Sequence, residues 1–288
     1  MTPIVLGHEF AGEIVEVGEG VNRWRVGDRV VNLYHNFCGI CEHCLGGDER
    51  RCINIHEIFG LTVNGGYAEF ALAHERALEG LPEGIPYDVA ATLMSATGVG
   101  FHNTANIAGV RVGEEVIVTG ATGGVGSAAV QTAKLLGAKV WAVTSSENKV
   151  KLLEETGADH VILSTDGRFH KQILDDREGQ GLDVAIDCVG APTFNASLRS
   201  LHPRGRAVII GNVDGRRVEI NLGIIIVNTL RILGSDNVTR AAIRQTMALV
   251  SEGKLRPMIN ECMPLERAAD AHRILETKGT FGRIVLIP

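Results

Sequence analysis

Continuous apolar runs recur through the middle of the chain and predict the strands of a parallel sheet. The first covers 116–119 and the second 139–143, and three further runs lie within 157–162, 181–190 and 206–212. Such runs, rich in β-branched residues, are typical of strands buried on both faces. Segments of helical composition separate them, so strand and helix alternate, which predicts a doubly wound α/β domain.

The flanking regions follow other patterns. Residues 13–17 alternate polar and apolar, which predicts a half-buried strand, and 26–31 and 65–72 predict further short strands. The stretch 231–235 predicts the last strand of the parallel sheet, an edge suited to pairing with another subunit. An amphipathic helix is expected over 238–252. A small β region therefore precedes the α/β domain.

The turn after the first buried run is rich in glycine. Gly123 permits a tight turn, Gly124 lets the backbone approach a phosphate, and Gly126 lets the next helix pack on the strand. The whole turn consists of Gly120, Ala121, Thr122, Gly123, Gly124, Val125 and Gly126. Ala121 departs from the G-x-G-x-x-G pattern. Between a strand and a helix, the turn predicts a dinucleotide site, and the alternative is a purely structural turn.

The residues after the second run bear on which dinucleotide is bound. They are Thr144, Ser145, Ser146 and Lys149. Hydroxyl groups and an ammonium can bind a 2′-phosphate, which favours NADP(H) over NAD(H). The alternative is that a serine only caps the next helix. The residues at the carboxyl ends of two later apolar runs are expected to face the nicotinamide half of the cofactor. These are Val189 with Gly190, and Gly211 with Asn212.

Four cysteines lie close together, with the spacing C-x2-C-x2-C-x7-C. They are Cys38, Cys41, Cys44 and Cys52. Two-residue spacers let successive thiolates surround one cation, and four thiolates complete a tetrahedral shell, so the spacing favours a structural zinc. An iron–sulfur cluster and disulfide pairing are the alternatives.

His8 and Glu9 are adjacent polar residues near the start of the chain. Imidazole is a good zinc ligand and carboxylate an acceptable one. The pair could therefore bind a catalytic metal, or Glu9 could orient the site without touching it. The alternative is a loop histidine beside a capping glutamate.

Composition narrows the classes. The length of 288 residues suits about two domains, and 45% hydrophobic with 22% charged residues is typical of globular proteins. A net charge of −6 without a basic stripe argues against a nucleic-acid partner. No apolar run suits a membrane span and no signal peptide is visible. Cysteines grouped for metal binding indicate a reducing cytoplasm.

Taken together, the motifs resemble the zinc-containing medium-chain dehydrogenase/reductase superfamily, the alcohol dehydrogenase-like proteins. The resemblance is carried by 7–9, 27–30, the four cysteines, 65–69, 123–126 and 282–286. It implies a GroES-like catalytic domain interrupted by a Rossmann domain that binds NAD(P). The expected parts are 1–92 with the structural zinc lobe at 38–52, then 93–254, then a return over 255–288.

The chain departs from the family pattern at three places. Family members carry a segment ahead of the Gly-His-Glu element that usually supplies a catalytic cysteine, so the GroES-like domain is expected to be incomplete at its N-terminus, as in a truncated enzyme. A second catalytic cysteine is expected near 93–97, where the sequence has none. Thr144 stands where NAD-dependent members carry an acidic residue.

The resemblance implies an oxidoreductase that interconverts small alcohols and aldehydes or ketones, as a homodimer or homotetramer, with a catalytic zinc held partly by His8. The residues after the second run make NADP(H) the expected cofactor. One alternative is a 2-enoyl-CoA reductase of the acryloyl-CoA type, or a quinone reductase, without catalytic zinc. The stretches 211–215 and 230–237 resemble acryloyl-CoA reductase-like members. A further alternative is a non-catalytic, truncated nucleotide-binding protein.

Overall fold

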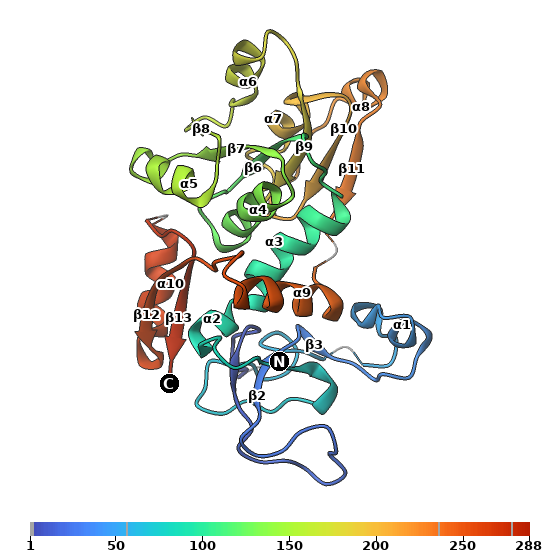
Figure 1. Ribbon diagram of the computed structural model, residues 1–288, viewed down its shortest axis with the longest axis vertical. Helices are drawn as coiled ribbons and strands as arrows, with labels where there is room; N and C mark the ends of the chain where they lie inside the picture. The colour runs from blue at the N-terminus through green and yellow to red at the C-terminus, as the bar shows by residue number, and fades with distance from the viewer. Residues whose placement is uncertain (1–2, 56, 236, 278) are drawn as a thin grey trace. The chain divides into compact units, whose positions relative to one another are not determined.

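The chain divides into two compact units in a computed structural model that describes residues 3–55, 57–235, 237–277 and 279–288 (Figure 1). The first unit comprises Met1–Gly98 and Val238–Pro288, and the second comprises Val99–Asn237. The second unit is therefore one continuous stretch inserted within the first. The sequence suggested divisions at 92/93 and 254/255. Helix α9 (Arg240–Ser251), grouped there with the nucleotide-binding part, belongs to the first unit.

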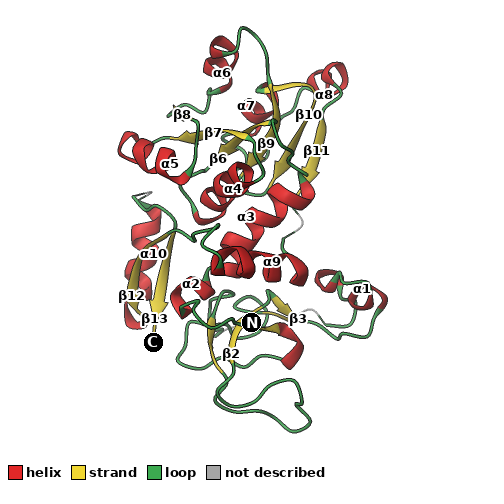
Figure 2. Cartoon of the chain, viewed as in Figure 1, coloured by secondary structure: helices red, strands yellow, loops and turns green. Residues whose placement is uncertain are grey.

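A six-stranded parallel sheet forms the centre of the second unit, as Figure 2 shows in yellow. Its strands are β6 (Glu115–Thr119), β7 (Lys139–Thr144), β8 (His160–Leu163), β9 (Leu182–Asp187), β10 (Leu201–Ile209) and β11 (Arg231–Gly234). Their order is β11-β10-β9-β6-β7-β8, and each neighbouring pair is parallel. The strand order reverses between β6 and β9, which confirms the predicted doubly wound sheet.

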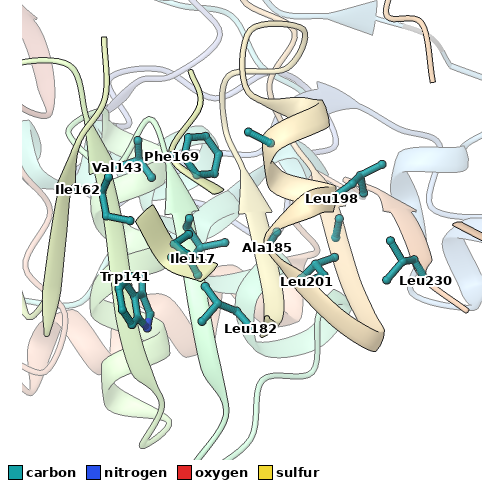
Figure 3. Close-up of a cluster of buried hydrophobic side chains, with 13 residues drawn as sticks. Ile117, Trp141, Val143, Ile162, Phe169, Leu182, Ala185, Leu198, Leu201 and Leu230 are labelled. Atoms are coloured by element: carbon teal, nitrogen blue, oxygen red, sulfur yellow. The ribbon is translucent and has the colours of Figure 1, made fainter. Parts of the chain in front are cut away.

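Helices cover both faces of this sheet. They are α3 (Val99–His102), η4 (Asn103–Ile107), α4 (Gly124–Leu135), η5 (Glu147–Lys149), α5 (Val150–Thr156), α6 (His170–Asp176), α7 (Phe194–Arg199) and α8 (Leu222–Asn228). Figure 3 shows the apolar cluster in which Ile117 and Ala185 from the strands meet Leu198 from α7. Val116 and Val118, which alternate with Ile117 along β6, are also buried, as expected for a strand covered on both faces.

The first unit is built from short strands. The antiparallel sheet contains β1 (Ala11–Glu13), β2 (Arg29–Asn32) and β5 (Leu78–Gly80), and two pairs join β3 (His35–Asn36) to β4 (Glu57–Ile58) and β12 (Ile259–Pro264) to β13 (Arg283–Ile287). The helices are α1 (Glu42–Leu45), η1 (Glu49–Arg51), η2 (Glu75–Ala77), α2 (Tyr87–Ala91), η3 (Leu93–Gly98), α9, η6 (Leu265–Arg267) and α10 (Ala268–Glu276).

The strand predicted over 65–72 does not form, and that prediction was wrong. Phe70 and Leu72 are 70% and 91% exposed. The backbone of this segment instead bonds the loop that carries His8, because the Tyr67 amide donates to the carbonyl of Leu6 at 2.9 Å. The strand predicted over 13–17 was placed too late in the chain: β1 covers Ala11–Glu13, and residues 14–17 are not in a strand.

A buried carboxylate fastens α9 to β5 within the first unit. Glu79 is 2% exposed and accepts hydrogen bonds from three guanidinium groups, those of Arg23, Arg240 and Arg244, each at 2.6 Å. Burial alone would raise the pKa of Glu79, but the hydrogen bond from Arg244 and the three positive charges lower it. The cluster therefore fixes the point where the chain re-enters the first unit.

Of the residues that the structure describes, no helix is long and apolar enough to cross a membrane.

Candidate active site and metal centre

The loop that carries His8 and Glu9 is shaped by glycines. Gly7 has φ +93°, a conformation that favours glycine, and its carbonyl accepts a hydrogen bond from Gly66 at 2.8 Å. A Cβ on Gly65 would lie 1.9 Å from the Gly7 carbonyl oxygen, so no larger residue fits there. The Gly-Gly pair thus lets two backbone segments touch, which places the His8 loop against the turn before Tyr67.

A buried asparagine holds the same loop from the other side. The Asn32 amide group donates to the His8 carbonyl at 2.8 Å, and its oxygen accepts from the Phe10 amide at 2.8 Å. Asn32 is therefore bonded to the backbone on both sides of Glu9. The sequence did not single out Asn32, because its role depends on contacts between residues more than twenty positions apart.

The His8 side chain faces a hydroxyl group. Its Nε2 lies 3.3 Å from the Ser95 Oγ, and its ring meets the edge of Tyr34 at 5.3 Å between centroids. Ser95 lies in η3, a π-helical stretch of a kind that is frequent at functional sites. Burial lowers the pKa of His8, with a smaller contribution from the positive charge of Arg283, while the Glu9 charge acts in the opposite direction.

The Glu9 side chain has a different partner from that of His8. Its Oε2 forms an ion pair with Arg283 at the start of β13, whereas its Oε1 is buried and has no hydrogen-bond partner among the described residues. A buried acceptor without a partner is costly, so this oxygen is available to a donor or a cation. The pair brings together residues from the two ends of the chain within the first unit.

The donor set around His8 does not by itself complete a zinc site. Imidazole is a strong zinc donor, but Ser95 offers only a neutral hydroxyl where a thiolate would be favourable. Within the described residues, only the four cysteines gather three or more His, Cys, Asp or Glu ligand atoms. We therefore derive no chemical step through a catalytic metal.

The four cysteines do fit a metal ion. Their Sγ atoms all lie within 4.8 Å of one another, and they are free thiols. The amides of Ile40 and Cys41 each approach the Cys38 Sγ at 3.4 Å, as expected for donors to a thiolate. The set suits a tetrahedral structural zinc, which the sequence predicted.

The thiol pKa values indicate why a cation suits the cluster. Chiefly through the hydrogen bond from the Ile40 amide, the pKa of Cys38 falls to about 6. Burial, aided by the neighbouring Cys41, raises the pKa of Cys44 to about 12. Four thiolates packed together repel one another, and a divalent cation at their centre would favour the deprotonated form of all four.

The predicted dinucleotide turn lies at the carboxyl end of β6. Gly120 has φ +59°, and the Gly123 amide donates to the Gly120 carbonyl at 3.0 Å, which closes the turn before α4. A Cβ on Gly126 would lie 2.2 Å from the same carbonyl oxygen. Ala121 is fully buried beneath the turn. The glycine spacing is thus a steric requirement of the turn itself.

At the end of β7, Thr144 is buried, and its hydroxyl accepts a hydrogen bond from the Ser146 amide at 3.2 Å. Ser145 is exposed, whereas Lys149 is only 7% exposed, and burial lowers the pKa of its ammonium group. The hydroxyl of Thr144 therefore shapes its own turn. No acidic side chain follows β7 before Glu147.

A parallel sheet whose strand order reverses beside a glycine turn is typical of a domain that binds a dinucleotide. The family models agree. Residues 1–83 match the alcohol dehydrogenase GroES-like domain, and residues 124–252 match the zinc-binding dehydrogenase domain.

Known proteins extend this match over nearly the whole chain. Acryloyl-coenzyme A reductase of Sulfurisphaera tokodaii is 38% identical over 99% of this chain and 84% of its own length. A crystal structure of AibC superimposes with a TM-score of 0.92 at 42% identity, over 100% of this chain and 80% of that one. The crystal structure of an NAD-dependent alcohol dehydrogenase superimposes with a TM-score of 0.92 at 33% identity, over 99% of this chain and 83% of that one. The chain belongs to the zinc-containing medium-chain dehydrogenase/reductase family.

Proposed function

We propose that the protein reduces the double bond of a 2-enoyl thioester of the acryloyl-CoA type, with NADP(H) as hydride donor. The observation that carries the proposal is the hydroxyl of Ser95, which faces His8 at 3.3 Å. A hydroxyl is a poor zinc ligand but a good hydrogen-bond donor. The acryloyl-coenzyme A reductase relative, at 38% identity, supports this substrate class.

Reduction of an enoyl thioester requires a hydrogen-bond donor to the thioester oxygen and does not require a metal. A nicotinamide bound at the turns after β9 and β10 would supply a hydride to the β-carbon of the double bond, and negative charge would develop on the thioester oxygen. The Ser95 hydroxyl and the imidazole of His8 would donate hydrogen bonds to this oxygen. Because burial lowers the pKa of His8, a neutral imidazole with one N–H is expected near pH 7. The α-carbon then takes a proton from solvent.

The cofactor would occupy the carboxyl edge of the six-stranded sheet. We assign its pyrophosphate to the turn from Gly120 to Gly126 and its nicotinamide half to the turns after β9 and β10. The preference for NADP(H) rests on the missing acidic group after β7, where Thr144 is followed by two serines. A carboxylate there would repel a 2′-phosphate.

A direct assay tests the substrate class. Purified protein is mixed with NADPH or NADH and either acryloyl-CoA or a small aldehyde, and the decrease in nicotinamide absorbance is followed. Faster turnover of the thioester with NADPH is expected. Oxidation of small alcohols at comparable kcat/KM, with two zinc ions per chain, would instead establish the second candidate, an alcohol dehydrogenase, which the 33% identical structure favours.

A matched pair of variants tests the role of Ser95. Ser95→Ala removes the proposed donor and should lower kcat for the thioester by roughly 100-fold, the usual effect of losing one oxyanion donor. Ser251→Ala, at the exposed end of α9, should leave kcat unchanged. Equal activity of the two variants would contradict the proposed role.

We also propose a homodimer that pairs through β11. This strand is an edge of the sheet, and the adjacent α8 exposes Leu222, Ile226 and Val227. An apolar helix beside a free strand edge is suited to a second copy of the chain. Light scattering should give a mass twice that of one chain, and Ile226→Glu should lower the measured mass toward that of a single chain.

A further inference from the structure

A fully buried carboxylate lies at the end of β9, and no motif drew attention to it. Asp187 is 0% exposed. Its Oδ1 accepts hydrogen bonds from the amides of Val189 and Gly190 at 3.0 and 2.9 Å and from the Thr119 hydroxyl at 2.9 Å. Val189 and Gly190 lie in the turn that follows β9, and Thr119 is the last residue of β6, directly before the glycine turn. One side chain therefore joins the turn after β9 to the end of β6 at the carboxyl edge.

Hydroxyl groups near the start of α7 complete the shell. The Ser197 hydroxyl donates to Asp187 Oδ2 at 2.7 Å, and the Thr193 hydroxyl approaches both carboxylate oxygens, at 2.7 and 2.9 Å. The donors that the structure describes are all uncharged. A buried carboxylate without a basic partner is costly, and short hydrogen bonds to it are stronger than those to a neutral acceptor. Such an arrangement fixes its donors more firmly than a neutral side chain would.

The backbone of the same residue reaches the third turn. The Asp187 carbonyl accepts from the amides of Ile210 and Gly211 at 2.8 and 3.1 Å, directly after β10. The Thr119 hydroxyl, while donating to the carboxylate, also accepts from the Cys188 amide at 3.2 Å. The turns after β6, β9 and β10 thus share one hydrogen-bonded centre.

The three turns leave no space for independent movement. A Cβ on Gly211 would lie 2.1 Å from the Cys188 carbonyl oxygen, and a Cβ on Gly190 would lie 2.5 Å from that of Gly211. On the other side, a Cβ on Gly120 would lie 3.0 Å from Val189 Cγ2. Because the backbones of the turns after β9 and β10 already touch, and Gly120 lies against the Val189 side chain, a displacement of one turn is expected to reach the next.

We propose that Asp187 is the positioning residue of the nicotinamide end of the cofactor site, where it sets the turns around Gly190 and Gly211 without contacting the cofactor. The inference rests on the proposed assignment of these turns to the nicotinamide half. They lie on neighbouring strands at the edge where the strand order reverses, which is where a dinucleotide binds such a sheet.

The test compares a whole cofactor with its adenine half. Dissociation constants are measured by titration calorimetry for NADPH and 2′-phospho-ADP-ribose, and in parallel for NADH and ADP-ribose, so that the ratio within each pair does not depend on which cofactor is preferred. Asp187→Asn keeps the size and one acceptor but removes the charge. We expect the dissociation constant of the whole cofactor to rise roughly tenfold and that of the fragment to change less than about threefold.

A control variant uses the other aspartate of the same strand. Asp183, at the opposite end of β9, accepts from the Glu115 amide at 2.7 Å and from His202 Nε2 at 2.8 Å. Asp183→Asn should lower the thermal midpoint without changing the ratio between cofactor and fragment. This separates a general loss of stability from a loss of positioning.

Two further variants keep the proposal testable if Asp187→Asn does not fold. Thr119→Val preserves volume but removes a donor that ties the β6 turn, and it should shift the ratio in the same direction. Ser197→Ala removes a donor from α7 and should not. Equal weakening of cofactor and fragment, or no weakening, would overturn the role of Asp187 alone. Wild-type protein that binds neither dinucleotide would overturn the proposed function as well.

Discussion

Different kinds of contact stabilise each of the two units internally. The second unit has a six-stranded sheet with an apolar cluster on its face, and its carboxyl edge is ordered by glycines and one buried carboxylate. The first unit has strands of two to six residues, and polar groups join segments of it that are distant in sequence: four thiols, the Glu79 cluster and the Glu9–Arg283 pair.

This contrast follows from what each unit has to do. The backbone of the glycine turn must lie in one defined position. Apolar packing and glycines without a Cβ atom fix that position, and neither depends on pH near neutrality. The site around His8 needs polar groups in position, and polar fixings depend on protons and metal ions. We therefore expect metal removal and acid to act on the first unit, and substitutions of glycine to act on the second.

Removal of the metal should have the largest effect. A structural zinc contributes on the order of 10 kcal/mol to small domains, so chelation or Cys41→Ser should lower the thermal midpoint of the first unit by about 10 °C or more. Cys262→Ser, an exposed cysteine outside the cluster, is the control and should melt like wild type. Calorimetry should resolve two transitions, of which only one moves. A single unmoved transition would show that the cysteine lobe contributes little.

Loss of the Glu79 carboxylate should come next. Glu79→Gln leaves three guanidinium groups around a neutral amide and should destabilise the first unit by about 3 kcal/mol. Since the pKa of Glu79 is lowered from 4.5, its contribution is complete above that pH and is lost as the pH falls through the lower folded value. Between pH 6 and pH 3 the thermal midpoint should therefore fall more steeply with decreasing pH in wild type than in the variant. Parallel profiles would disprove the linkage.

A methyl group in the glycine turn should act on cofactor binding. Gly126→Ala places a Cβ 2.2 Å from a backbone oxygen that cannot yield, and we expect roughly 100-fold weaker NADPH binding, equivalent to ~2.7 kcal/mol. Gly123→Ala is the milder neighbour, because its Cβ would lie 3.4 Å from the Gly120 oxygen. If fluorescence titration gave Gly126→Ala the affinity of wild type, the turn would not be the phosphate site.

The smallest effect is expected for the zinc affinity of a cysteine variant at position 95. Ser95→Cys sets a thiol beside the His8 imidazole, and zinc affinity at this site should rise about tenfold, equivalent to ~1.4 kcal/mol. Zinc content is measured after dialysis against a range of free zinc concentrations, with Ser251→Cys as the control. Identical zinc uptake by the two variants would show that His8 is not placed for a metal.

The sequence could predict what is local. The run over 116–119, the glycine turn and the helix that follows are adjacent in the chain, and their pattern specified strand, turn and helix correctly. The cysteine spacing likewise placed four thiols together. Contacts between distant residues left no such signal. Examples are the hydroxyl of Ser95 beside His8, 87 positions away, and the Thr119 hydroxyl on Asp187, 68 positions away.

The strand expected over 65–72 is an element that the local pattern predicted but that does not form. Alternating apolar residues such as Phe70 and Leu72 indicate a strand only when another strand is there to pair with it. In the described structure the backbone amides of Gly65 and Gly66 bond the His8 loop instead. Strand prediction from a pattern therefore depends on partners that the local sequence does not contain.

The ion pair of Glu9 with Arg283 has a consequence for how the protein folds. It joins residues 274 positions apart, so its formation closes almost the entire chain into a loop. The entropic cost of that closure is reduced when the stretch 99–237 has already collapsed into a folded insert, since the remaining flexible chain is then shorter. During synthesis Glu9 can form this pair only after Arg283 has left the ribosome. The loop that carries His8 is thus expected to be among the last parts of the protein to become ordered.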